Sequence, residues 1–136
     1  WARVLPTLTI KDQISRWCLV MSELFYVAGD LDRAEEWGQR GLTIPVLSTA
    51  RQLYSTLALV QARLGEADVA ERTARAGLEA FPDDFQLHLS MAMALQQTGR
   101  FSEAMAHYRE SLRLNPDQER ADKIREEIEA LETGRR

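Results

Sequence analysis

Apolar residues recur along much of this chain at the three- and four-residue spacings of a helix face. Between residues 85 and 98 the apolar face is formed by side chains at i, i+4, i+7 and i+8, namely Leu87, Met91, Ala94 and Leu95. Either aspartate of the pair 83–84 can cap this helix, and Gly99 can end it because glycine adopts left-handed backbone without steric cost. A second amphipathic run follows and ends at Asn115-Pro116, since proline cannot continue a helix. The pattern predicts two helices joined by a tight turn.

The same arrangement recurs at a fixed offset. Four positions recur 34 residues apart, in the pairs Gly65/Gly99, Ala70/Ala104, Leu78/Leu112 and Pro82/Pro116. A looser copy stands 36 residues earlier, in the pairs Gly29/Gly65, Ala34/Ala70, Gly41/Gly77 and Leu42/Leu78. A fixed period of this length is typical of repeat proteins, in which one helical unit cannot bury its apolar face alone and stacks on its neighbour.

These offsets divide the chain into five segments. They are an N-terminal segment at 1–14 that we expect to be the end of a preceding repeat, three repeats at 15–50, 51–84 and 85–118, and a C-terminal capping helix with a tail at 119–136. The first helix of the first repeat is predicted to be lined by its large apolar residues, Trp17, Met21, Leu24 and Phe25. The first repeat also carries two extra residues within 46–50, which we expect in the connection between repeats because loops tolerate changes of length.

Residues 85–118 resemble a tetratricopeptide repeat. The family places small residues where the two helices cross, an aromatic residue in the second helix and a proline after it; the matching residues are Met91-Ala92, Leu95, Gly99, Ala104, Tyr108, Ser111 and Pro116. The second repeat matches at Tyr54, Leu57-Ala58, Gly65, Ala70, Gly77 and Pro82, and the first at Met21-Ser22, Phe25, Gly29, Ala34 and Gly41. The departures from the pattern are Cys18, Gly38, Gln61 and Ala74. The resemblance covers about residues 15–132 and implies an all-α fold, in which antiparallel helix-turn-helix repeats stack as a right-handed α-solenoid.

The resemblance also implies that the first helices of successive repeats line a concave groove. By that register the groove residues are Leu19, Glu23, Tyr26, Ser55, Leu59, Arg63, Leu89, Met93 and Gln96. Leucine and methionine suit an adaptable apolar contact, tyrosine can anchor a ligand with its polar tip, and arginine can hold a carboxylate. We therefore expect a protein-interaction scaffold that binds a peptide or helix of a partner protein. The alternative for each apolar groove residue is ordinary packing against its neighbours.

A second interpretation is structural. The module would then drive self-association or pack against another domain of its own chain, and a homo-oligomer is open in either case. The contact residues would be Trp1, Val4, Leu5 and Trp37. Because the sequence begins at Trp1 without a methionine, we expect it to be a piece of a longer protein. Its arginine-rich, lysine-poor composition suggests a GC-rich, bacterial genome.

One known use of the family is not expected here. Co-chaperones of this class hold a C-terminal peptide carboxylate with lysine, asparagine and arginine side chains from the first helices. The matching places in this chain are Leu19, Glu23, Thr56, Gln86 and Ser90. None of these residues is cationic and one is acidic, so the arrangement that would hold a chaperone tail is missing.

Charge and hydropathy narrow the classes of partner. The net charge is −4 and the isoelectric point is about 5.2, and the basic residues are scattered among acids, which argues against a nucleic-acid-binding surface. No run of apolar residues approaches the length of a membrane span, so we expect no membrane insertion in this segment. A cytoplasmic location is favoured.

Residues with catalytic or metal-binding chemistry are sparse. His88 and His107 are assigned to different helices, one at a packing position and one facing solvent, and a metal site needs more ligands at close spacing. Cys18 occupies a packing position, where a free thiol behaves as a small apolar side chain. We therefore expect no enzyme activity, no metal and no cofactor.

Overall fold

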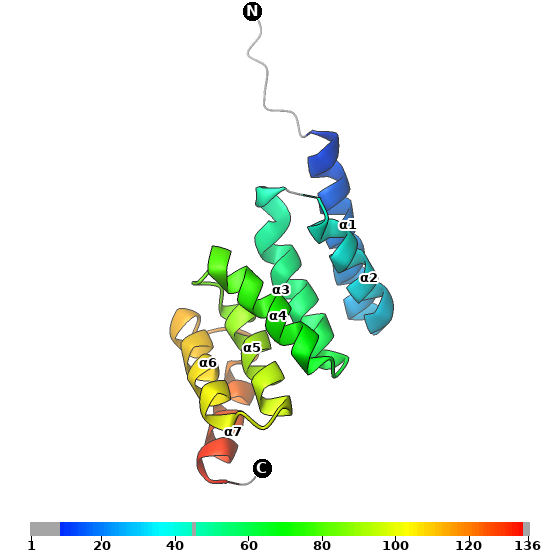
Figure 1. The fold of residues 1–136 in the computed structure, drawn as a ribbon. Coiled ribbons are helices and arrows are strands. Elements are labelled where there is room, and N and C mark those ends of the chain that lie inside the picture. Colours follow the sequence, from blue (N-terminus) through cyan, green and yellow to red (C-terminus); the bar gives the residue numbers. More distant parts are fainter. Residues whose placement is uncertain (1–8, 45, 135–136) are drawn as a thin grey trace, which may run out of the picture.

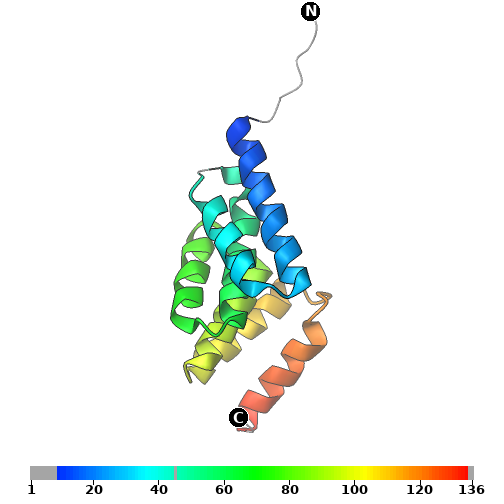
Figure 2. The ribbon, with the colours of Figure 1, turned by 90° about the vertical axis from the view of Figure 1, so that its right-hand side faces the viewer.

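The chain is described by a computed structural model that covers residues 9–44 and 46–134. These residues form seven α-helices and no strand (Figure 1), with the bounds α1 Ile10–Ala28, α2 Leu31–Leu42, α3 Leu47–Arg63, α4 Ala67–Ala80, α5 Phe85–Gln97, α6 Phe101–Leu114 and α7 Ala121–Glu132. Three antiparallel pairs, α1/α2, α3/α4 and α5/α6, stack one after the other, and α7 follows at the C-terminal end (Figure 2). This arrangement confirms the predicted all-α solenoid.

The first helix is longer than the predicted first repeat, because its cap lies further upstream. The Thr9 hydroxyl accepts a hydrogen bond from the Asp12 backbone N–H at 3.1 Å, and the Asp12 carboxylate accepts one from the Thr9 N–H at 2.9 Å. This reciprocal capping box starts α1 at Ile10, upstream of residue 15, where the predicted first repeat begins. A hydrogen bond from the Thr9 hydroxyl to the Asp12 carboxylate at 2.6 Å, and then the one from the Thr9 N–H, lower the pKa of Asp12. Residues 1–8 of the predicted N-terminal segment lie outside the described residues.

The predicted cap and stop of α5 are both present. One carboxylate oxygen of Asp84 accepts hydrogen bonds from the backbone N–H groups of Gln86 and Leu87, at 2.9 and 3.1 Å. After α5, Gly99 has a φ of 80°, a left-handed conformation that favours glycine. The turn residues of the sequence therefore set where this helix begins and ends.

The two extra residues of the first repeat lengthen a helix, and the expectation that they lie in a loop was wrong. The helix α3 has 17 residues against 13 in α5, and residues 47–50 form its first turn. The additional turn lies against α1, where the buried hydroxyls of Ser15 and Thr49 form a hydrogen bond. In a helix the backbone N–H and C=O groups of this segment hydrogen-bond to one another. In a loop at the same place, buried backbone groups would have lacked such partners.

The main core lies in the C-terminal two thirds of the molecule. Its buried members come from α3 to α7: Ala58, Ala74, Leu87, Leu89, Met91, Ala92, Leu95, Ala104, Tyr108 and Ile124. The helices approach closely where residues are small. A Cβ atom added to Gly77 would lie 2.9 Å from the Leu87 side chain, so α4 and α5 meet through this glycine.

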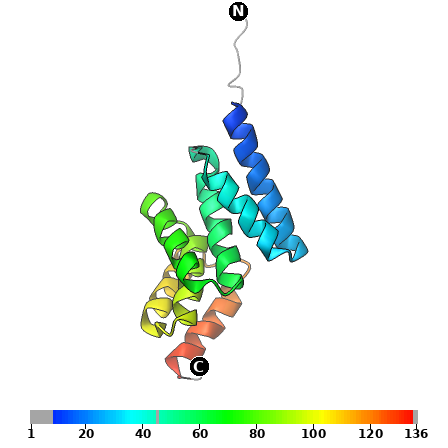
Figure 3. The ribbon, with the colours of Figure 1, turned by 45° about the vertical axis from the view of Figure 1, so that its right-hand side comes forward.

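The prediction for α1 was wrong for two of its large side chains. Trp17 and Leu24 are each 58% exposed, whereas the buried face of α1 carries Ser15, Cys18, Leu19 and Ser22. Figure 3 shows the reason, since α1 stands at one edge and packs only on α2 and α3. The residues that point away from both neighbours form an apolar outer face, which comprises Ile10, Ile14, Trp17, Val20, Leu24 and Val27. None of the described helices has the length and apolar character needed to cross a membrane.

Candidate functional site

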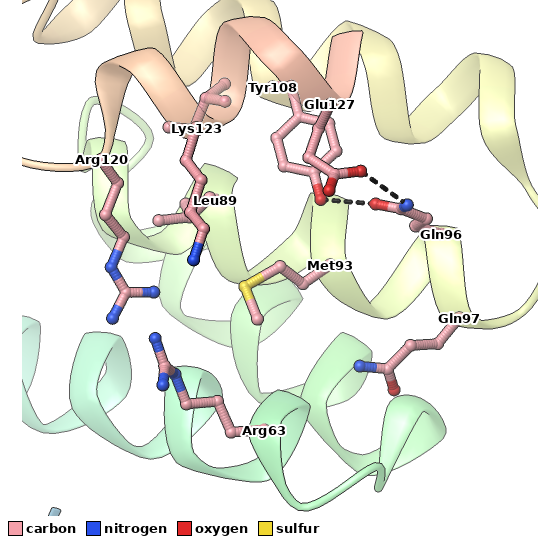
Figure 4. A pocket seen from close by; sticks show the side chains of 10 residues that line it. Arg63, Leu89, Met93, Gln96, Gln97, Tyr108, Arg120, Lys123 and Glu127 are labelled. Carbon is pink, nitrogen blue, oxygen red and sulfur yellow. Dashed lines mark hydrogen bonds between the residues drawn. The ribbon is translucent and has the colours of Figure 1, made fainter. Parts of the chain in front are cut away.

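A cavity of about 460 Å³ opens between α3, α5 and α7 (Figure 4). Its lining residues are Arg63 of α3; Leu89, Met93, Gln96 and Gln97 of α5; Tyr108 of α6; and Arg120, Lys123, Ile124 and Glu127 from the cap position and body of α7. The last helix and its cap therefore supply as many lining residues of this cavity as α5 does.

The floor of this cavity is apolar. Leu89 and Ile124 are almost fully buried and fix the floor between α5 and α7, while Met93 is half-buried and reaches the cavity. A flexible thioether at this place can adjust to apolar side chains of different shape. The floor is therefore suited to an apolar side chain of a ligand.

One wall of the cavity is a short chain of polar groups. The Tyr108 hydroxyl donates to Gln96 Oε1 at 2.6 Å, and Gln96 Nε2 donates to the Glu127 carboxylate at 3.0 Å. Both ends of the Gln96 amide are thereby oriented by the protein itself. Beside it, the Gln97 amide donates to the backbone carbonyl of Ala62 at 2.7 Å and ties α5 to α3.

The opposite wall gathers three cationic side chains. Figure 4 shows Arg63, Arg120 and Lys123 turned toward the same space beside Met93. Arg120 Nη2 donates to the Tyr26 hydroxyl at 2.8 Å, and Cζ of Arg63 lies 5.3 Å from the centroid of the Tyr26 ring. Within the described part of the chain, no carboxylate forms an ion pair with any of the three cations.

A second cavity of about 330 Å³ adjoins the first. Its lining residues are Tyr26, Leu59, Phe85, Gln86, Leu89, Asn115, Gln118, Glu119 and Arg120. The two cavities share Leu89 and Arg120, so together they form one concave surface that runs from α7 and α5 towards α1. We call this surface the groove.

The structure brings most of the predicted groove residues to this surface. The residues that line one or both cavities are Tyr26, Leu59, Arg63, Leu89, Met93 and Gln96. Three others line neither cavity. Leu19 is buried on α1, Glu23 is exposed with a pKa raised by partial burial, and Ser55 is buried and donates to Asp84 at 2.9 Å.

The sequence analysis missed the contribution of α7. The predicted capping helix at 119–136 supplied no predicted groove residue, yet Arg120, Lys123 and Glu127 line the first cavity. A signal for this position exists in the sequence. Lys123 and Glu127 flank Ile124, which lies at 2% exposure in the apolar stripe that packs on the core, so both must border the packed face.

The two histidines lie on different helices, as predicted, but they meet, and His107 is half-buried rather than facing solvent. His88 on α5 and His107 on α6 have their Nδ1 atoms 3.0 Å apart, and their rings stack with centroids 5.3 Å apart. His88 Nε2 lies 2.9 Å from the Pro82 carbonyl oxygen, which only accepts, so Nε2 of His88 carries the proton and its Nδ1 accepts from His107. Burial, followed by the neighbouring His88, lowers the pKa of His107. Among the described residues no cluster of three or more metal-ligating side chains is found.

A second polar cluster lies between the first and second helix pairs. Burial and the neighbouring Glu66 carboxylate raise the pKa of Glu35 to about 7. Gln61, where the repeat pattern usually has a bulky apolar residue, is buried, accepts a hydrogen bond from Thr73 at 2.6 Å and also bonds to Glu35. The departure at Gln61 thus supports a half-buried carboxyl pair. Cys18 is buried, and burial raises the pKa of its thiol.

Comparisons with known proteins bear on these features. A family model described as tetratricopeptide repeat matches residues 55–119. A search of curated protein sequences found no match. Among solved structures, the chain is similar to the TPR domain of Arabidopsis OM64, with a TM-score of 0.79, 16% identity, and coverage of 90% of this chain and 98% of that chain.

Two further similar structures contain peptides. The second TPR domain of human RPAP3, in complex with the HSP70 peptide SGPTIEEVD, has a TM-score of 0.70 and 16% identity over 87% of this chain and 98% of that chain. The Yersinia enterocolitica type III secretion chaperone SycD, in complex with a peptide of the translocator YopD, has a TM-score of 0.75 and 14% identity over 89% of this chain and 94% of that chain. Another structure of SycD is described as an alternative dimer. At these identities the likeness establishes a common fold.

Proposed function

Because the chain is built of tetratricopeptide repeats, we propose that it is a non-catalytic scaffold that binds a peptide or helix of a partner protein in the groove. The observation that carries the proposal is the pair of adjoining cavities on the concave side of α3 and α5. They combine an apolar floor with oriented polar groups and charges, as ligand sites do. The structures of RPAP3 and SycD, which are similar to this fold, hold bound peptides, and this supports peptide binding by the chain.

The proposed binding surface comprises the predicted residues together with the part supplied by α7. Leu59, Leu89 and Met93 form the apolar contact, and Gln96 and Tyr26 offer polar groups near it. Leu19, Glu23 and Ser55 line neither cavity, so we propose no ligand contact for them and regard them as supporting neighbours on α1 and α3. A chaperone tail is not the proposed ligand, because Thr56, Gln86 and Ser90 offer no cation where such a tail would be held.

Affinity capture from native lysate tests this proposal. Wild type, Leu59→Glu and Met93→Glu are used as baits, with Met105→Glu as the control, since Met105 is half-buried on α6 and lines neither cavity. We expect partners that are lost with both groove variants and kept with the control. Because Met93 also packs on the core, each variant is accepted only if its helical content and melting temperature remain near wild type. Equal capture by folded groove variants would contradict the proposal.

A second candidate function is self-association, and the outer face of α1 favours it. The residues of this face, Ile10, Ile14, Trp17, Val20, Leu24 and Val27, are three or four positions apart and form one exposed apolar stripe along the helix. Exposed apolar patches of this kind mark interaction sites. Of the contact residues expected from the sequence, Trp1, Val4 and Leu5 lie outside the described residues, and Trp37 is half-buried beneath Arg40, whose Cζ is 4.9 Å from its ring centroid.

Light scattering over a range of concentrations tests self-association. We expect the molar mass to rise with concentration in wild type and to stay at the monomer value in Trp17→Gln/Leu24→Gln. Exposed Leu47 on α3, changed to glutamine, is the control outside the outer face of α1. A monomeric wild type at high concentration would remove this candidate.

A further inference from the structure

We propose that the groove recognises an internal acidic segment of the partner. In this arrangement Arg63, Arg120 and Lys123 hold the side-chain carboxylate of an aspartate or glutamate, and Leu89 and Met93 hold an apolar side chain next to it. The inference rests on the proposed function and adds the chemistry of the ligand to it.

The first argument is the charge of the site against that of the chain. The whole sequence carries a net charge of −4, yet the wall of the first cavity concentrates three positive side chains. Elsewhere most of the described arginines pair with carboxylates, as Arg100, Arg109 and Arg113 do. Glu127 is the carboxylate among the lining residues of the same cavity, so the lining carries more positive than negative groups. The three cations repel one another, and an anion placed between them relieves this repulsion.

The second argument is that two of the cations are already held in place. Tyr26 contacts both, since its hydroxyl accepts from Arg120 and its ring lies under Arg63. A guanidinium has five N–H donors, so Arg120 keeps most of its donors for a ligand. Side chains that are ordered before binding lose less entropy on binding, and arginine pairs with carboxylates through two parallel hydrogen bonds.

The third argument fixes the neighbourhood of the carboxylate. Leu89 and Met93 lie beside the cations and give the ligand an apolar contact that excludes water, which strengthens the charge interaction. Glu127 is the acidic residue of the first cavity, and its carboxylate already accepts a hydrogen bond from Gln96. Glu119 lines the second cavity and disfavours a second acidic side chain there.

The fourth argument concerns an internal as against a C-terminal carboxylate. The two cavities share Arg120 and Leu89, so concave surface continues on both sides of the cation cluster. A ligand chain can therefore enter and leave past Arg120, with its acidic side chain directed at the cations.

Selection from a phage-displayed library of random peptides, with fixed residues at both ends, tests the inference. The baits are wild type, Arg63→Gln/Lys123→Gln and Met93→Glu, and Arg72→Gln is the control because Arg72 is an exposed arginine of α4 outside the groove. We expect wild type and the control to select peptides with aspartate or glutamate beside an apolar residue. The double variant is expected to lose the acidic preference and keep the apolar one.

The other outcomes separate this inference from the proposed function. Peptides that depend on Met93 but show no acidic preference, or that bind the double variant equally well, overturn the inference and leave groove binding in place. Absence of any peptide that depends on Met93 overturns both. A library displayed with free C-termini is selected in parallel, and an acidic preference seen only at the last residue overturns the internal carboxylate.

Fluorescence anisotropy with an end-blocked selected peptide gives the size of the effect. Replacing its glutamate by glutamine, or Arg120 by glutamine, is expected to weaken binding about tenfold, as the loss of a charge-assisted hydrogen bond does. Lys123→Gln is the cleaner variant, because Lys123 has no ion pair within the described part and the change leaves the Tyr26–Arg120 contact intact. Unchanged affinity in Lys123→Gln and Arg120→Gln together would overturn the inference.

Discussion

The helices α1 and α5 are each the first of a helix pair, yet they turn their large side chains in opposite directions. On α5 the buried face holds Leu87, Met91 and Leu95. On α1 it holds Ser15, Cys18, Leu19 and Ser22, while Trp17, Leu24 and other large residues face outward. The difference follows from their neighbours, since α5 packs on α3, α4 and α6 but α1 only on α2 and α3. One helix is stabilised within the molecule, and the other leaves an apolar face to be covered.

The difference between α5 and α1 should be largest in the free energy of unfolding that is lost when a leucine is replaced by alanine. Leu87→Ala removes a fully buried side chain and is expected to lower the free energy of unfolding by about 2–5 kcal/mol, from lost burial and the cavity left behind. Leu24→Ala on α1 is the matched control and should change it by less than about 0.5 kcal/mol, because Leu24 is mostly exposed. Urea unfolding measures both. Equal losses would show that α1 buries its outer face.

Overpacking tests the crossing of α5 and α6. Ala104 is fully buried, so Ala104→Leu is expected to lower the free energy of unfolding by about 1–3 kcal/mol. Ala106→Leu places the same side chain on an exposed position of the same helix and serves as the control. Thermal melting followed by circular dichroism measures the difference. A neutral Ala104→Leu would mean that the repeat register on α6 is misplaced.

The two halves are also expected to respond oppositely to pH, and the first response comes from Glu35 on α2. Its pKa is raised from 4.5 to about 7, so the folded state holds a proton that the unfolded state releases above pH 4.5. Glu35 therefore makes its full contribution to the free energy of unfolding below about pH 4.5, and this contribution is lost as the pH rises through 7. Solvent screening of this half-buried group reduces it to on the order of 1 kcal/mol.

Glu35→Gln removes this response. The variant should be more stable than wild type above pH 7 and similar to it near pH 4.5, as measured by urea unfolding at each pH. Exposed Glu79→Gln on α4 is the control. If the variant and wild type differ equally at both pH values, the Glu35–Glu66 pair does not share a proton.

The response of the C-terminal half comes from the histidine pair. The pKa of His107 is lowered from 6.5, so the unfolded state takes up a proton as pH falls below 6.5 while the folded state does not. Stability is then lost as pH falls below 6.5, because burial and the neighbouring His88 disfavour the charged imidazole more than Glu103 and Glu110 favour it. In His107→Gln the free energy of unfolding, measured by urea unfolding at each pH, should fall less as the pH drops below 6.5. An equal fall in wild type and variant would contradict the assignment of the titration to His107.

The repeat pattern predicted the helix pairs because turn chemistry and apolar spacing act locally. Gly99 and the Asp84 cap could be found from the sequence, since each acts within a few residues of its own position. The groove register followed in the same way for Arg63, Leu89 and Met93, which share one side of their helices.

What the sequence could not predict depends on contacts between distant elements. The helix α7 lies after the last repeat, so no register placed Arg120 and Lys123 in the groove. On α1 the small residues Ser15, Cys18 and Ser22 lie on the core face and the large Trp17 and Leu24 lie outside, so side-chain size indicated the wrong face. His88 and His107 meet only because two helices cross at that point. These features depend on tertiary contacts, and among them only the position of Lys123 beside Ile124 has a signal in the sequence.

The hydrogen bond between Tyr26 and Arg120 also has a kinetic meaning. Most packed helix pairs in this molecule are neighbours along the chain, as in other stacked repeats, so folding can begin at any pair and spread outward. This one bond instead joins residues 94 positions apart. It can form only after every intervening pair is in place, so the Tyr26 hydroxyl reports completed assembly. A spectroscopic probe at this side chain would time the last step of folding.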